Sequence, residues 1–92
     1  MLPVLWRASA RTALARIIHY IAKDNPAAAR RLKDMVEASV LPLAQHPYLY
    51  RSGRVPGTRE IVVHPNYILV YAVRAERIEV LHLLHARQQY PE

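Results

Sequence analysis

The last third of the chain limits the possible folds more than any other feature, because its apolar residues follow a strand pattern with very short breaks. Segments 59–64, 67–74 and 77–85 are rich in Val, Ile, Leu and Tyr, the residue types that favour strands. They are separated only by Pro65-Asn66 and Ala75-Glu76, and two residues are enough for a hairpin turn. The middle segment is apolar on both faces, which is typical of a central strand covered on both sides. The pattern therefore predicts an antiparallel meander of three strands.

Ahead of these strands the apolar residues recur with helical spacing. A first stripe consists of Ala10, Ala13, Leu14, Ile17, Ile18 and Ile21, and a second of Ala29, Leu32, Met35, Val36, Val40 and Leu43. Between the stripes, Asn25 can cap a new helix and Pro26 fits its first turn, where no backbone N–H is needed. We therefore expect an antiparallel helical hairpin with a corner of two or three residues. Pro42 should end or kink the second helix near Leu41, because its ring clashes with the preceding turn.

Two further segments complete the expected fold. Residues 2–6 are a short apolar run that we interpret as a first strand. Residues 45–57 contain both glycines of the chain, which predicts a surface loop. The order of elements is then β-α-α-β-β-β, an α+β fold in which the helical hairpin packs against a mostly antiparallel four-stranded sheet. At 92 residues, we expect a single domain with one core over residues 1–92.

Charge and composition narrow the class of protein. The net charge is +6 and eleven of the thirteen cations are arginines, whose planar guanidinium groups suit phosphates and carboxylates. Nucleic acid or an acidic protein is therefore a natural partner. The chain has no cysteine, which excludes disulfides and thiolate metal sites and fits a reducing compartment. The sequence shows neither a secretion signal pattern nor an apolar run of membrane-spanning length, so we expect a cytoplasmic protein without a membrane partner.

Four stretches occur in a characteristic order: "NPAAARRLKDMVEASV", "LAQHPYLYRSGRVPGTREIVV", "NYILVYAV" and "IEVLHLLHARQQYP". With this order, the chain resembles the RelE/ParE superfamily of bacterial type II toxins over nearly its whole length. The resemblance implies that the protein is the toxin of a toxin–antitoxin pair, of the kind also called plasmid stabilisation systems. It further implies a cognate acidic, partly disordered antitoxin that wraps the toxin in a hetero-oligomer.

Within the superfamily, the RelE-like members are ribosome-dependent endoribonucleases that cut messenger RNA with a cluster of basic residues. Cations beside the phosphate stabilise the charge that develops during cleavage. By this resemblance the catalytic residues would be Arg59, His85, Arg87 and Tyr90. Aliphatic Ile61 and Ile68 stand where two further basic residues are expected, which argues against RNA cleavage.

The ParE-like members poison DNA gyrase by binding, and their last strand often closes with a His-x-Arg triplet. The "HAR" triplet from His85 to Arg87 is similar to that pattern, so we favour a gyrase inhibitor over an mRNA endoribonuclease. The target-binding residues would be His85, Arg87, Arg51, Arg54, Tyr48 and Tyr50. A third alternative is an inactive or weakly toxic basic binding module that its antitoxin stabilises. For Arg87, the structural alternative is an ion pair with Glu60 or Glu79 across the sheet.

The histidines of the last strand do not predict a metal site. His82 and His85 are three residues apart, and on a strand such residues point to opposite faces. We expect His82 to share a face with Ile78, Val80 and Leu84, and His85 to be accessible at the strand end. The sequence predicts neither a metal nor another cofactor.

Overall fold

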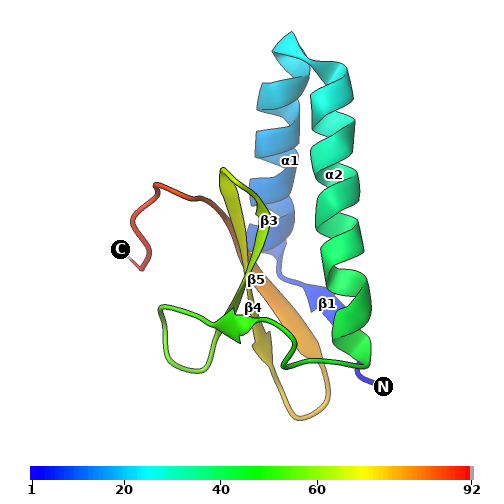
Figure 1. The fold of residues 1–92 in the computed structure, drawn as a ribbon, viewed down its shortest axis with the longest axis vertical. Coiled ribbons are helices and arrows are strands. Elements are labelled where there is room, and N and C mark those ends of the chain that lie inside the picture. Colours follow the sequence, from blue (N-terminus) through cyan, green and yellow to red (C-terminus); the bar gives the residue numbers. More distant parts are fainter. Residues whose placement is uncertain (92) are drawn as a thin grey trace.

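The computed structural model describes residues 1–91 and confirms the α+β class. Its elements are β1 (Val4–Trp6), α1 (Ala8–Asp24), α2 (Pro26–Val40), the 3-10 helix η1 (Leu41–Ala44), β2 (Arg51–Ser52), β3 (Arg59–His64), β4 (Tyr67–Val73) and β5 (Ile78–His85). The five strands form one sheet in the order β1-β5-β4-β3-β2, and the helical hairpin lies on one of its faces (Figure 1). All neighbouring strands are antiparallel except β1, which runs parallel to β5.

The sheet has one strand more than expected, because β2 lies within the predicted loop. Its two residues, Arg51 and Ser52, pair with Glu60 and Arg59 of β3. A strand of two residues has no periodicity that a sequence pattern can reveal. Gly53 closes the following turn by donating its N–H to the Thr58 carbonyl at 2.7 Å, and an added Cβ at Gly53 would collide with the Thr58 side chain.

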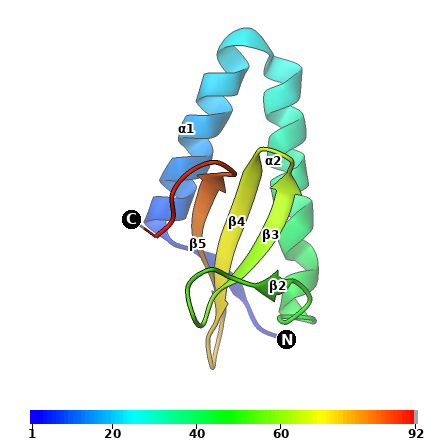
Figure 2. The same cartoon turned by 60° about the vertical axis from the view of Figure 1, so that its left-hand side comes forward.

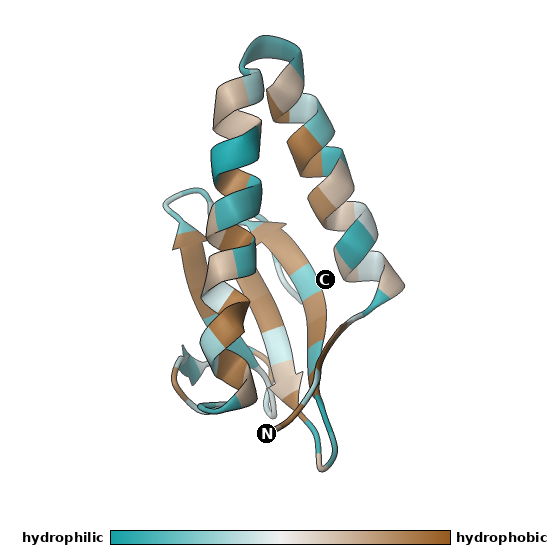
Figure 3. Cartoon of the chain, turned by 90° about the vertical axis from the view of Figure 1, so that its right-hand side faces the viewer, coloured by the Kyte–Doolittle hydropathy of each residue, from teal (hydrophilic) through white to brown (hydrophobic). Residues whose placement is uncertain are grey.

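Local sequence signals set the bounds of the helical hairpin, but its corner is the single residue Asn25 and not the two or three residues expected. The Asn25 side chain accepts a hydrogen bond from the Ala28 N–H at 3.0 Å, and Pro26 occupies the first turn of α2. The α-helix ends at Val40, and the chain continues through η1, which contains Pro42. Figure 3 shows brown, hydrophobic strands beneath helices of mixed character, which is the pattern of amphipathic helices covering a sheet.

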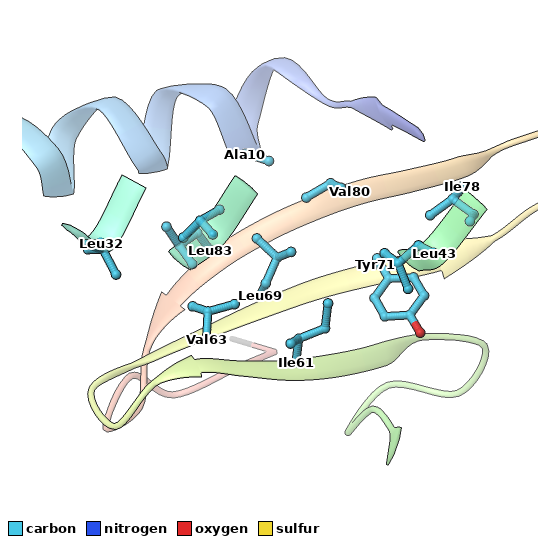
Figure 4. Packing of buried hydrophobic residues seen from close by; sticks show 11 residues of the cluster. Ala10, Leu32, Leu43, Ile61, Val63, Leu69, Tyr71, Ile78, Val80 and Leu83 are labelled. Atoms are coloured by element: carbon cyan, nitrogen blue, oxygen red, sulfur yellow. The ribbon is translucent and has the colours of Figure 1, made fainter. Parts of the chain in front are cut away.

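The core lies between the hairpin and the sheet (Figure 4). Its buried cluster comprises Ala10, Leu32, Val36, Leu43, Ile61, Val63, Leu69, Tyr71, Ile78, Val80 and Leu83. Tyr71 is the largest fully buried side chain, and its hydroxyl donates to the Pro47 carbonyl at 2.8 Å. Burial raises the pKa of the Tyr71 phenol above its ordinary value of 10.0. The core therefore anchors the segment before β2 as well as the helices.

A β-bulge changes which residues of β5 face the core. Tyr71 pairs with Val80 whereas the preceding Val70 pairs with His82, so Leu81 has no partner on β4. The extra residue reverses the alternation of side chains along β5. The prediction that His82 shares a face with Ile78, Val80 and Leu84 was therefore wrong for Ile78 and Val80, which face the core, and right for Leu84. His82 faces away from the helices together with Val70.

The bulge also anchors the start of α1. The Ser9 hydroxyl donates to the Leu81 carbonyl at 3.1 Å, and the Arg7 N–H donates to the Val80 carbonyl at 2.9 Å. Within residues 1–91, no helix is both long and apolar enough to cross a membrane.

Candidate functional site

The predicted site residues fall into two groups, and the first lies around the segment of residues 51–58, here called the arginine loop. Glu60 is only 3% exposed and holds this loop. Its carboxylate accepts the Arg54 backbone N–H at 2.9 Å and the Arg51 Nη2–H at 3.3 Å. The Arg54 Nε lies 3.5 Å from the same carboxylate. Arg51 and Arg54 therefore share a buried acidic partner that lies outside the loop itself.

Arg59 and the two loop tyrosines form a contiguous arrangement beside the arginine loop. The Arg59 Nη1–H donates to the Tyr50 carbonyl at 2.7 Å, and its guanidinium carbon lies 4.8 Å from the centre of the Tyr48 ring. The Tyr50 hydroxyl donates to the Ser39 carbonyl of α2 at 3.0 Å. A hollow of about 390 Å³ opens here, with Tyr48, Thr58 and Arg59 among its lining residues. The Arg59 side chain therefore holds the segment of Tyr48 and Tyr50 in place through these two contacts.

The second group lies on the C-terminal tail, defined here as residues 86–91, and on the strand end before it (Figure 2). The His85 Nδ1 accepts the Arg87 backbone N–H at 3.1 Å, so a neutral His85 ring carries its hydrogen on Nε2. Its ring stands edge-on to Tyr67, with centroids 5.5 Å apart. His85 and Arg87 are both exposed. Within residues 1–91, Arg87 makes no ion pair with Glu60, Glu79 or another carboxylate.

Tyr90 lies on the face of the sheet opposite the helices. Its ring stands edge-on to His82 with centroids 5.7 Å apart. In the described part of the chain, the buried His82 Nδ1 has no hydrogen-bond partner. No three His, Asp or Glu side chains of residues 1–91 lie close enough together to hold a metal ion.

The two groups occupy opposite ends of the sheet. Arg59 begins β3, whereas His85 lies opposite Tyr67, which pairs with His64 at the other end of β3. The six residues of β3 span about 17 Å at the rise of an extended strand. The backbone of Arg59 therefore lies about the length of β3 away from the level of His85.

The sheet face away from the helices is here called the open face because no helix of residues 1–91 covers it, and it carries few polar side chains. It is not freely exposed, since Ile68, Val70, Ala72 and Leu84 are each at most 5% exposed. On β3, β4 and β5 it comprises Glu60, Val62, Ile68, Val70, Ala72, Glu79, His82 and Leu84, as the register and the core cluster require. The only lysine or arginine of these three strands is Arg59, which pairs with Tyr71 on the helix side. The open face of these strands thus presents no lysine or arginine of its own.

Arginines that approach the open face from its margins are paired. Arg51 and Arg54 contact Glu60, as described above. On the other side Arg7, Arg74 and Arg77 contact Glu79 at 3.1 to 3.2 Å. The hydrogen bond from Arg74 is the main cause that lowers the pKa of the Glu79 carboxyl below its ordinary value of 4.5.

A groove on the helical hairpin, here called the helix groove, was not predicted from the sequence. It has a volume of about 640 Å³, and its lining consists of Trp6, Arg11, Leu14, Ala15, Ile18, Lys33, Glu37, Val40 and Leu41. Leu41 is 75% exposed there, an unusual exposure for a large apolar residue next to other apolar side chains. The helical spacing could not reveal the groove, because Leu41 lies in η1, outside the apolar stripe of α2.

Comparison with known proteins identifies the family. The profile of the ParE toxin of the type II toxin–antitoxin system parDE matches residues 4–90. Y4kP of Sinorhizobium fredii, which is named as a toxin, is 37% identical over 97% of this chain and 93% of its own length. Toxin RelE2 of Caulobacter vibrioides is 31% identical over 94% of this chain and 97% of its own.

A solved structure has the same fold. The chromosomal ParDE toxin–antitoxin system from P. aeruginosa contains a chain that superimposes with a TM-score of 0.79 at 24% identity, over 92% of this chain and 96% of that one. The fold and the sequence together define a type II toxin of the RelE/ParE superfamily. Within that class, the chain belongs to the ParE toxin family.

Proposed function

We propose that this toxin arrests growth in the bacterial cytoplasm by binding and poisoning DNA gyrase, without catalysing a reaction. One observation carries the proposal: the open face of β3, β4 and β5 bears no cation of its own, and the arginines at its margins are paired with Glu60 and Glu79. Cleavage of RNA by its own 2′-OH needs cations beside the phosphate to stabilise the charge that builds up. An apolar face with paired arginines does not supply them.

The C-terminal tail supplies the contact with the target. His85 and Arg87 are exposed at the end of β5, and the hydrogen bond between them fixes the path of the chain where it leaves the sheet. Arg87 can offer a two-pronged hydrogen bond to a carboxylate or phosphate of the target. The arginine loop and Tyr48 would form a second contact region, in which Tyr48 is exposed and Arg51 and Arg54 are oriented by Glu60.

The partner that neutralises the toxin is a cognate acidic antitoxin, and the helix groove is its docking site. The floor of the groove is apolar, and Arg11, Lys33 and Glu37 stand among its lining residues. Lys33 already pairs with Glu37 at 3.7 Å, whereas Arg11 has no ion pair within residues 1–91. An amphipathic segment with an acidic flank would bury the exposed Leu41 and complement Arg11. The helix groove and the C-terminal tail lie on different parts of the fold. Binding of the antitoxin can therefore be tested separately from binding of the target.

The test is to induce the full chain in growing bacteria and to follow DNA and protein synthesis separately over the first minutes. We expect DNA synthesis to stop first. The purified chain should also inhibit supercoiling by gyrase. The substitution Arg87→Gln should remove both effects. Arg30→Gln, which changes an exposed arginine of α2, serves as the matched control and should leave both effects intact.

The opposite result would replace this proposal with the alternative. Early arrest of translation with cleaved messages would show that the protein is an mRNA endoribonuclease despite the apolar open face. Absence of growth arrest, with the chain folded and abundant, would favour the weakly toxic binding module.

A further inference from the structure

The helical hairpin projects beyond the end of the sheet at which the turn between β3 and β4 lies (Figures 1 and 2). A hollow of about 360 Å³ lies beneath this projection and is here called the overhang pocket. Its lining consists of Ile21, Ala28, Arg31, Leu32, Met35, His64, Asn66 and Tyr67. The pocket exists because the hairpin continues where the sheet has ended, so part of its underside has no strand to cover it.

One side of the overhang pocket is an apolar wall from the helices. Ile21 of α1 and Leu32 of α2 contribute to it, and Met35, which is 41% exposed, lies at its edge. The wall is separate from the helix groove, since the two hollows share no lining residue. An apolar ligand body of modest size can pack against it.

The polar groups of the overhang pocket can all donate hydrogen bonds, and none of its lining residues is acidic. The His64 Nδ1 accepts the Asn66 backbone N–H at 3.0 Å, so the neutral ring presents Nε2–H as a donor. Tyr67 is held between two imidazoles, with ring centroids 5.6 Å from His64 and 5.5 Å from His85. Its hydroxyl and the Asn66 side-chain amide are further donors.

Arg31 provides the only charge of the overhang pocket. Within residues 1–91 it forms no ion pair with a carboxylate, in contrast to the arginines around Glu60 and Glu79. A guanidinium without an acidic partner, beside an apolar wall and neutral donors, matches a planar carboxylate attached to an apolar body.

We propose that the overhang pocket binds a small carboxylate with an apolar body, in which Arg31 pairs with the carboxylate and the helix wall covers the rest. His64, Asn66 and Tyr67 would complete the hydrogen bonds to its oxygens. A volume of this size is in the range of ordinary small-molecule pockets, in which a few polar groups orient a mainly apolar ligand. The inference does not depend on gyrase being the target.

The test is an NMR titration of the isotope-labelled full chain with 3-phenylpropionate. Its uncharged amide, 3-phenylpropionamide, and inorganic phosphate are titrated in parallel. We expect the acid to shift the amide signals of Arg31, Leu32 and Asn66. The uncharged amide should bind at least about tenfold more weakly, because it lacks the charge-assisted hydrogen bonds to Arg31. Inorganic phosphate, which has no apolar body, should not saturate these signals.

Two variants distinguish binding in the overhang pocket from nonspecific attraction of the acid to the positively charged protein. Arg31→Met keeps the length of the side chain and removes its charge, and we expect at least about tenfold weaker binding of the acid. Arg30→Met makes the same change at the neighbouring exposed position and should bind like the unchanged chain. The spectra themselves show whether each variant is folded. Equal binding of acid and amide, saturation by phosphate, or equal loss in both variants would each overturn the proposal.

Discussion

The arginine loop and the C-terminal tail are both basic segments beside the sheet, but the fold holds them in different ways. In the loop, the buried Glu60 carboxylate pairs with both arginines and with a backbone N–H. In the tail, Arg87 is tied through its backbone to His85 while its side chain is left unpaired within residues 1–91. Arginine therefore stabilises the fold in the loop and remains available for recognition in the tail.

Glu79 extends this contrast to the other margin of the sheet. Arg7, Arg74 and Arg77 surround it, so five of the eleven arginines of the chain pair with only two carboxylates. The total of thirteen lysines and arginines therefore overstates how many cations are free to meet a partner.

The largest loss of stability among the changes considered is expected for Glu60→Gln. The substitution weakens three interactions of a buried carboxylate, and hydrogen bonds to charged groups contribute roughly 1.5 to 3 kcal/mol. Because Arg51 is partly hydrated, we expect the free energy of unfolding to fall by about 2 kcal/mol in urea denaturation. The control is Glu37→Gln, which breaks the exposed pair with Lys33 and should cost under about 0.5 kcal/mol. Equal effects would show that Glu60 does not hold the loop.

A smaller loss is expected for Tyr71→Phe, which removes the hydroxyl that anchors Pro47. One hydrogen bond contributes about 1 kcal/mol, and urea denaturation can measure this difference against Tyr20→Phe at an exposed position. Because the folded-state pKa of Tyr71 is raised, its neutral form stabilises the fold below the ordinary value of 10.0. This contribution is lost as the pH rises through the folded-state pKa. The phenylalanine variant should therefore lose less stability in alkali than the unchanged chain.

The effect of Glu79→Gln should depend on pH. The pKa of Glu79 is lowered in the folded state, chiefly by the Arg74 hydrogen bond. Its contribution to stability is therefore present above the ordinary value of 4.5 and disappears as the pH falls through the folded-state pKa. We expect the variant to be less stable than the unchanged chain at pH 7 and equally stable in strong acid, as followed by thermal unfolding. Glu76→Gln, at an exposed turn residue, should show no such convergence.

The smallest change in stability should accompany the largest change in function. Arg87→Gln removes an exposed side chain without an ion pair in the described part of the chain, so the free energy of unfolding should change by less than about 0.5 kcal/mol. Growth inhibition should nevertheless be lost. Arg51→Gln should have the opposite effects. It should lower the free energy of unfolding measurably and reduce growth inhibition less than Arg87→Gln does. If Arg87→Gln unfolds more readily than Arg51→Gln, the claim that the loop arginine stabilises the fold and the tail arginine does not is wrong.

Much of the fold could be predicted from local patterns. The Asn25 cap, the end of α2 before Pro42 and the strand meander all depend on residues close in the sequence, and each is present. The β2 strand and the Leu81 bulge could not be predicted, because the pairing partner on another strand defines both of them.

The candidate site also has features that could be predicted from the sequence and features that could not. The fold class, the helical hairpin and the accessible "HAR" ending could be predicted from residues close in the sequence, since spacing and turn chemistry act over a few residues. Which arginines lack an acidic partner depends on contacts between segments that are far apart in the sequence. The partner of Arg51 and Arg54 is Glu60 on the neighbouring strand, and the separation of Arg59 from His85 follows from the length of β3. Such pairings depend on strand register and on the path of the loop, which arise only when the whole chain packs around one core.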